Sequence, residues 1–164
     1  MRILGIDPGV ATVGYGVVDY NAGRFKHVRH GIIKTAPHQP LSLRLLEISH
    51  DMQELLDMFK PDAVSMEELF FSKNITTGIA VAHARGVLLL ECRRANVPTY
   101  QYNPMQVKMA VTGYGAAEKK QVMEMTKRML NLEALPRPDD AADALAVAIC
   151  YAHASGHMSD DKMI

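Results

Sequence analysis

The sequence lacks several features that indicate particular classes of protein. Its 164 residues include no tryptophan and only two cysteines, Cys92 and Cys150. These cysteines lie far apart and outside any metal-ligand spacing, so we expect two reduced, buried thiols and no zinc site. The strongest apolar run, residues 86–92, is short and ends at Arg93 and Arg94. We therefore expect no membrane span, no signal peptide and a cytoplasmic protein.

The chain also lacks an excess of charge of either sign. It has 18 basic and 18 acidic residues, so its formal net charge is zero. A basic domain is the usual mark of a nucleic-acid-binding protein, and composition alone therefore argues against such a partner. That argument weakens if several acids bind metal ions, because a bound cation reverses the field that its carboxylates present to phosphate.

No repeat, low-complexity tract or linker divides the chain. Its length and its 48% hydrophobic content are typical of one globular domain with a well-buried core. We expect a single domain over residues 1–156, followed by a polar and flexible tail over residues 157–164.

Hydrophobic periodicity predicts five strands and five helices. The strands are expected at residues 3–7, 13–18, 24–35, 62–69 and 97–103, and the helices at 41–59, 75–95, 104–113, 117–131 and 139–154. Pro8 and Gly9 join the first two strands as a hairpin. Three successive strands followed by alternating helices and strands predict a mixed α/β fold, with a sheet covered on both faces.

Two acidic residues end apolar strands in this pattern. Asp7 follows the first strand and Glu67 lies near the end of the fourth, and sites in open α/β sheets gather at the carboxyl ends of strands. Simpler roles remain open, since Asp7 can brace the turn and Glu67 can be a solvated strand end. Glu67 and Glu68 point to opposite faces, so only one of them can join Asp7, and the family resemblance given below favours Glu67.

The segment "DDAADALA" (139–146) carries the strongest acidic signal. Asp140 and Asp143 are three residues apart and project from one face of a helix, where two like charges repel unless a cation lies between them. Asp139 is explained by the preference for acids in the first turn of a helix. Asp143 lies a turn further in, among alanines, and needs a partner.

Oxygen ligands from Asp7, Glu67, Asp140 and Asp143 are the kind that Mg²⁺ or Mn²⁺ prefers. Two such ions, about 4 Å apart, can activate a water on one side of a phosphodiester and stabilise the leaving oxygen on the other. The pattern therefore indicates phosphodiester hydrolysis.

At this point the chain resembles the RuvC Holliday-junction resolvases, within the ribonuclease H-like superfamily. The resemblance runs almost from end to end. It rests on "ILGIDPGVATVGYGVV" (3–18), "MEELFFSKN" (66–74), "ARGVLLL" (84–90), "QVKMAVTGYGAAEKKQV" (106–122) and "DDAADALAVAI" (139–149). It implies a ribonuclease H-like fold and a homodimeric, Mg²⁺-dependent endonuclease that nicks four-way junction DNA symmetrically, with a branch-migration helicase as partner.

The resemblance also implies roles for individual residues. The four catalytic and metal-binding acids fall on Asp7, Glu67, Asp140 and Asp143; some relatives carry histidine in place of Asp140, which leaves the metal preference open. The DNA-binding candidates are Phe70, which matches an aromatic that stacks at the opened junction, with Phe71, Lys73, Arg85, Lys108, Lys119 and Lys120. Stacking on an unpaired base contributes about 1–3 kcal/mol. The lysines and the arginine suit phosphate contacts, although a solvated charged face explains Lys120 equally well.

Several alternatives stay open on sequence alone. The helix over residues 75–95 has small residues that permit either a dimer interface or packing onto the sheet. The first hairpin also resembles the phosphate-binding hairpin of sugar-kinase and actin-like proteins, which need two such lobes. A ribonuclease H-like nuclease acting on RNA/DNA hybrids or flaps, and a junction-binding module without activity, are the remaining readings.

Overall fold

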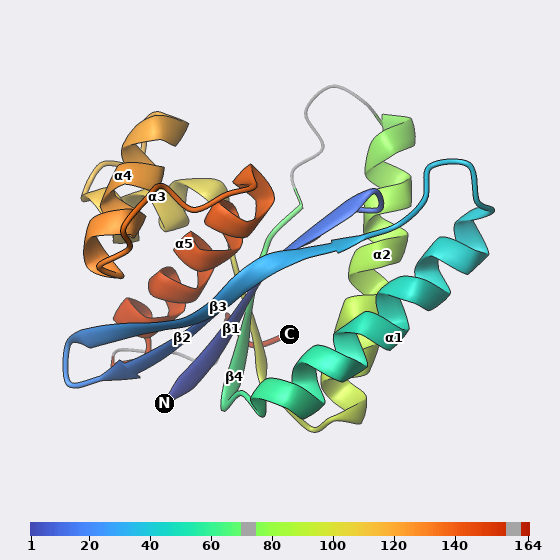
Figure 1. Ribbon diagram of the computed structural model, residues 1–164, viewed down its shortest axis with the longest axis horizontal. Coiled ribbons are helices and arrows are strands. Elements are labelled where there is room, and N and C mark those ends of the chain that lie inside the picture. Colours follow the sequence, from blue (N-terminus) through green and yellow to red (C-terminus); the bar gives the residue numbers. More distant parts are fainter. Residues whose placement is uncertain (70–74, 157–161) are drawn as a thin grey trace.

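A computed structural model describes residues 1–69, 75–156 and 162–164 of the chain. A central five-stranded sheet lies between two layers of helices (Figure 1). Its strands are β1 (Arg2–Asp7), β2 (Thr12–Asn21), β3 (Arg24–Lys34), β4 (Ala63–Glu67) and β5 (Thr99–Tyr102). The sheet order is β3-β2-β1-β4-β5, with β1 to β3 antiparallel and with β4 and β5 parallel to β1. The predicted mixed α/β architecture is confirmed.

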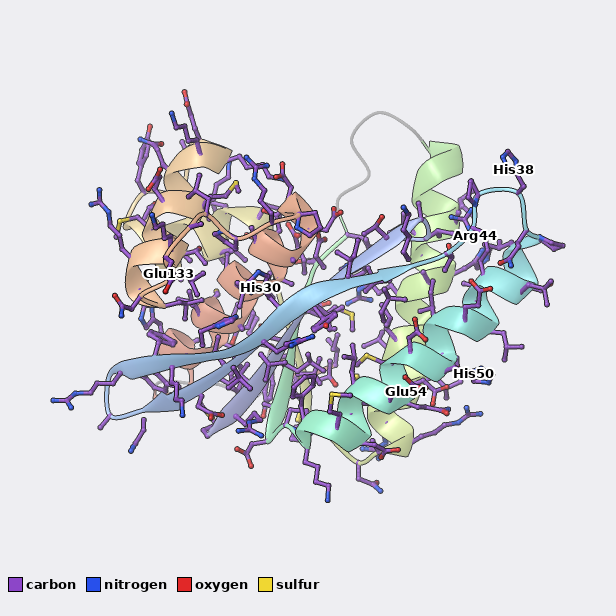
Figure 2. All side chains as sticks on the ribbon, in the orientation of Figure 1. His30, His38, Arg44, His50, Glu54 and Glu133 are labelled. Atoms are coloured by element: carbon purple, nitrogen blue, oxygen red, sulfur yellow. The ribbon has the colours of Figure 1, made fainter. Side chains whose placement is uncertain are left out.

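One face of the sheet is covered by α1 (Leu41–Phe59) and α2 (Ile75–Arg94) (Figure 1). Their contact with the sheet is made by long apolar side chains, including Ile48 and Met52 of α1 and Leu88 of α2, all fully buried. The exposed side of α1 carries polar residues such as His50 and Glu54 (Figure 2). This amphipathic pattern is what made the bounds of α1 predictable.

The other face is covered by α5 (Asp139–Ala154), with α3 (Pro104–Thr112) and α4 (Lys119–Met129) outside it (Figure 1). Here glycines of β1 and β2 face the backbone of α5. A methyl group on Gly5 would lie 2.0 Å from the backbone oxygen of Ala144, and one on Gly14 would lie 2.0 Å from that of Asp140. The helix therefore packs directly against the sheet, which alanines on α5 also permit.

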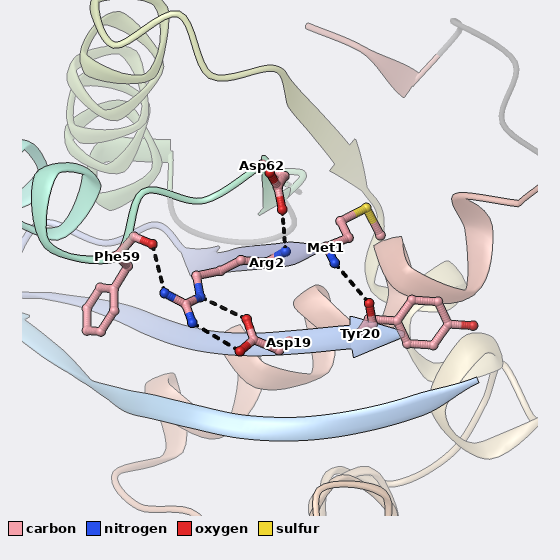
Figure 3. Close-up of polar contacts among 6 residues, drawn as sticks. All are labelled: Met1, Arg2, Asp19, Tyr20, Phe59 and Asp62. Atoms are coloured by element: carbon pink, nitrogen blue, oxygen red, sulfur yellow. Dashed lines mark hydrogen bonds and ion pairs between the residues drawn. The ribbon is translucent and has the colours of Figure 1, made fainter. Parts of the chain in front are cut away.

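The amino-terminal end of β1 is tied to its neighbours by a cluster of polar contacts (Figure 3). The Arg2 guanidinium donates to both carboxylate oxygens of Asp19, at 2.8 and 3.0 Å, and to the carbonyl oxygen of Phe59 at 3.2 Å. The backbone N–H of Arg2 donates to Asp62 at 2.6 Å. These contacts lie at the end of β1 remote from Asp7, and they fix the strand that carries this acid.

The end of the chain differs in part from the predicted flexible tail. Met163 forms an antiparallel bridge with Tyr100 of β5, and the N–H of Ile164 donates to the carbonyl oxygen of Thr99 at 2.9 Å. Residues 162–164 therefore extend the sheet edge by backbone pairing, which the polar composition of the tail did not indicate. Cys92 and Cys150 are free and buried, as predicted. None of the described helices is long and apolar enough to cross a membrane.

Candidate active site

Two of the predicted acids meet at the ends of adjacent strands. Asp7 is the last residue of β1 and Glu67 is the last residue of β4, and the two strands run parallel, with Ile6 opposite Met66. The two side chains lie close enough for the charge of Glu67 to raise the pKa of Asp7. Glu68 lies one residue further on, and its charge acts on Arg85 of α2 instead. The prediction that Glu67 rather than Glu68 approaches Asp7 agrees with this arrangement.

The first two turns of α5 bring the other two acids to the same place. Asp140 lies over Gly14 of β2, and Gly14 is the residue that pairs with Asp7 across the hairpin. Asp143 follows one turn later on the same side of the helix, and the charges of both residues act on Asp7. Close packing of α5 against the glycines therefore sets the distance between its acids and the strand ends.

The electrostatics show how crowded the negative charge is. Burial, followed by the neighbouring charges of Glu67, Asp143 and Asp140, raises the pKa of Asp7 to about 8. Burial and then the charge of Asp143 raise the pKa of Glu67, and burial also raises that of Asp143. A group of carboxylates with raised pKa values binds either protons or a cation at neutral pH.

Asp143 has a basic partner, which sequence inspection near the residue did not find. The Lys119 ammonium, from the first turn of α4, donates to Asp143 Oδ2 at 2.8 Å. The same ammonium lies 3.5 Å from Asp139 Oδ2, and Arg137 pairs with the other oxygen of Asp139. Asp139 was predicted only as an acid of the first helical turn; its role between two cations was missed because Lys119 lies in a different helix.

A groove of about 270 Å³ opens beside these acids. Lys108 of α3 and Lys119 of α4 line it together with Glu67 and Asp143. Apolar residues complete its lining: Pro104, Val107, Val122, Ala146 and Val147. The groove thus combines acids that can bind cations with lysines that can bind an anionic backbone.

The side chains present fit a hard divalent cation. The four acids offer only oxygen donors, their mutual repulsion is relieved by positive charge, and oxygen donors are what Mg²⁺ and Mn²⁺ prefer. Across residues 1–69, 75–156 and 162–164, no three acidic, histidine or cysteine side chains already form a closed ligand set. Lys119 engages Oδ2 of Asp143 in this arrangement and so competes with a metal ion for that oxygen.

Of the remaining DNA-binding candidates, the two that the structure describes, Lys120 and Arg85, do not line the groove that contains Lys108 and Lys119. Lys120 lines a separate groove with Tyr114 and Arg128, on the other side of α4. Arg85 of α2 donates to Gln101 of β5 at 2.6 Å, is half-buried and is not among the residues that line the groove beside the acids. Phe70, Phe71 and Lys73 lie outside the described residues.

A mixed sheet of this order, with acids gathered at the ends of its central strands and on the helix that crosses it, defines a nuclease of the ribonuclease H-like class. The sequence profile described as "Crossover junction endodeoxyribonuclease RuvC" matches residues 3–151. The chain therefore belongs to the RuvC family.

Individual relatives agree with that assignment. The crossover junction endodeoxyribonuclease RuvC of Brevibacillus brevis is 55% identical over 152 residues, which cover 93% of this chain and 92% of that protein. The solved structure of Thermus thermophilus RuvC in complex with a Holliday junction substrate has a TM-score of 0.93 and 38% identity, covering 100% and 99% of the two chains. The yeast mitochondrial Holliday junction resolvase shares the fold, with a TM-score of 0.64 at 14% identity over 92% of this chain and 78% of that one.

Proposed function

We propose that this protein is a structure-selective endonuclease that resolves four-way DNA junctions by paired nicks, in DNA recombination and repair. The observation that carries the proposal is the convergence of Asp7, Glu67 and Asp143 beside a groove that also contains Lys108 and Lys119. Membership of the RuvC family, and the junction bound by the Thermus relative, indicate the substrate.

The metal proposed for the site is Mg²⁺, with two ions for each active site and with Mn²⁺ able to substitute. Asp7, Glu67, Asp140 and Asp143 would hold them, and Asp7 is the candidate for the shared ligand because the charges of the other three acids all act on it. When bound, such ions lower the pKa of a water molecule and stabilise charge on the attacking and leaving oxygens.

The other side chains of the groove would position the DNA. Lys108 and Lys119 lie on helices α3 and α4, which place two ammonium groups on the same groove as Glu67 and Asp143. Their contacts with phosphate oxygens hold the backbone without reading its sequence, because every phosphate presents the same charge. Phe70 or Phe71 is proposed to stack on an unpaired base at the junction, and Lys73, Arg85 and Lys120 are proposed as further phosphate contacts.

We also propose that the protein acts as a homodimer. A four-way junction with two-fold symmetry requires two sites related by the same axis. Helix α2 is the proposed interface, since it exposes Ile79 and Leu90 at 52% and 48% of their surface. A branch-migration helicase is the proposed partner in the cell.

The direct test is cleavage of defined substrates. The purified protein is incubated with Mg²⁺ and an end-labelled immobile four-way junction, beside a nicked duplex, a flap and an RNA/DNA hybrid. Paired nicks at symmetric positions on the junction alone are the expected result. Cleavage of the hybrid or flap in preference to the junction would contradict the proposed substrate but would still show nuclease activity. Tight binding of the junction without any nick would contradict the proposal that the protein is an enzyme.

A further inference from the structure

A row of alternating charges borders the acidic site. Lys119 Nζ lies 2.8 Å from Asp143 Oδ2 and 3.5 Å from Asp139 Oδ2, and Asp139 Oδ1 pairs with the Arg137 guanidinium. Asp139 and Asp143 are four residues apart on α5, so they lie one above the other on the same side of the helix. Lys119 therefore faces two carboxylates, of which only Asp143 belongs to the predicted metal-binding set.

Lys119 and a divalent cation compete for Asp143. The Lys119 ammonium donates to Asp143 Oδ2 at 2.8 Å, so it occupies one of the two oxygens that Asp143 could offer to a metal ion, and two cations beside one carboxylate repel each other. Metal binding by Asp143 is therefore favoured when the Lys119 ammonium moves away from Oδ2. Asp139 is the nearest second carboxylate, and it already contacts this ammonium at a longer distance.

We propose that Asp139 is a positioning residue that receives Lys119 when Asp143 binds metal. Arg137 holds one oxygen of Asp139 and leaves the other directed at Lys119. The transfer keeps Lys119 at the border of the groove, where its ammonium can meet a phosphate of the substrate, and it frees Asp143. This inference rests on the proposed function, because it assumes that the four acids bind divalent cations.

The test measures metal binding by the full-length protein without DNA. Mn²⁺ is titrated into wild type, Asp139→Asn, Lys119→Met and the double variant, and the bound ion is followed by calorimetry and by electron paramagnetic resonance. Asp139→Asn leaves Lys119 with Asp143 as its only carboxylate, so the Mn²⁺ affinity should fall by about tenfold, as for other residues that orient metal ligands. Lys119→Met removes the competitor and should increase the affinity.

The double variant separates positioning from a general loss of negative charge. Once Lys119 is absent, Asp139→Asn should change the Mn²⁺ affinity by less than about twofold, because Asp139 is half-exposed and its direct effect on an ion is screened. Glu124→Gln, an acid of α4 that lines the other groove, is the matched control and should leave the affinity unchanged. Asp139→Ser retains a side chain favoured at a helix start and repeats the test if the asparagine variant folds poorly.

The possible results are distinguishable. An equal loss of Mn²⁺ affinity for Asp139→Asn in the presence and absence of Lys119 would overturn the positioning role, while leaving the metal site intact. No effect of Asp139→Asn in the wild-type background would overturn it as well. Failure of the wild-type protein to bind any Mn²⁺ would overturn the proposed metal site and, with it, this inference.

Discussion

The two faces of the sheet are built on different principles. The face under α1 and α2 is filled by long side chains such as Ile48, Met52 and Leu88. The face under α5 has glycine against helix backbone, with Gly14 directly beneath Asp140. Long side chains can adjust their rotamers, whereas backbone contacts cannot. The first face therefore mainly stabilises the fold, and the second positions the catalytic candidates.

Their buried acids differ in the same way. Glu91 of α2 is 2% exposed and is satisfied by Ser49 at 2.8 Å, Gln53 at 2.7 Å and Arg94 at 2.9 Å. Burial would raise the pKa of Glu91, but these donors together hold it below its ordinary value. Asp7 is surrounded by other acids, and its pKa is raised to about 8. The carboxylate of Glu91 is therefore stabilised by donors from the protein itself, whereas the carboxylate of Asp7 still requires positive charge from a proton or a cation.

The largest expected effect comes from removing one acid of the site. Glu67→Gln should reduce junction nicking by at least about 10³-fold, because a metal-binding carboxylate is lost, and should change junction affinity by less than about threefold. Nicking assays and band shifts in parallel measure the two quantities. Glu68→Gln, the adjacent residue, is the control and should retain nicking. Equal losses for the two variants would refute the assignment of Glu67.

Packing changes on the two faces should separate activity from stability. Gly14→Ala forces a methyl group toward the backbone oxygen of Asp140, which displaces the start of α5. Nicking per folded molecule should fall by about 10²-fold, the usual cost of a displacement near 1 Å. Ile48→Ala on the other face should cost about 2–5 kcal/mol of unfolding free energy and change nicking by less than about threefold.

Nicking rates corrected for the folded fraction, together with denaturant unfolding, measure both effects. Similar losses of activity in Gly14→Ala and Ile48→Ala would show that the two faces do not differ in the way described.

The crowded carboxylates predict the pH dependence of the metal-free protein. Asp7 has an ordinary pKa of 3.8 and a folded-state pKa of about 8, so the folded state binds the proton more tightly between these values. Its contribution to stability is therefore present at low pH and is lost as the pH rises toward 8. Asp7→Asn should be more stable than wild type by about 1–3 kcal/mol at pH 8 without metal.

Thermal unfolding from pH 5 to 8, in a chelator, measures this difference. Mg²⁺ should restore the stability of wild type at pH 8 and have little effect on Asp7→Asn. Asp57→Asn, an exposed position of α1, is the control. A wild-type protein whose stability does not fall over this range would contradict the raised pKa.

The smallest effect is expected at Glu91. Glu91→Gln keeps the shape of the side chain but weakens hydrogen bonds from Ser49, Gln53 and Arg94, and should cost about 1–3 kcal/mol of unfolding free energy. Nicking at 25 °C should be unchanged, which chemical denaturation and the junction assay measure together. A loss of nicking larger than the loss of folded protein would show that this face also shapes the site.

Sequence periodicity predicted most of the fold. The bounds of α1 and α5 agree with the expected ranges because each follows a proline and has a continuous helical pattern. The observed β4 and β5 are narrower than predicted: β4 ends before Glu68 and Leu69, and β5 begins after Val97 and Pro98. The backbone pairing of Met163 was missed because a bridge at a sheet edge needs no particular side chain.

The sequence predicted which acids form the site, but it did not predict the contacts between those acids and the rest of the protein. Strand ends and helical spacing singled out Asp7, Asp140 and Asp143 without knowledge of the tertiary structure, whereas the choice of Glu67 over Glu68 rested on the family resemblance. The ion pair between Lys119 and Asp143 joins residues on different helices, so no local spacing reveals it. The need for glycine at position 14 could not be predicted either, because only the position of α5 shows why a side chain is excluded there.

The most direct test of the central claim is to locate the metal ions themselves. Crystals soaked in Mn²⁺ would be measured near the manganese absorption edge, where anomalous scattering identifies the ion. We predict two peaks, both at ligand distance from Asp7, about 2.1 Å, with Asp143 released from Lys119. No peak near Asp7, with the contact between Lys119 and Asp143 unchanged, would contradict the claim that these four acids form a metal-dependent nuclease site.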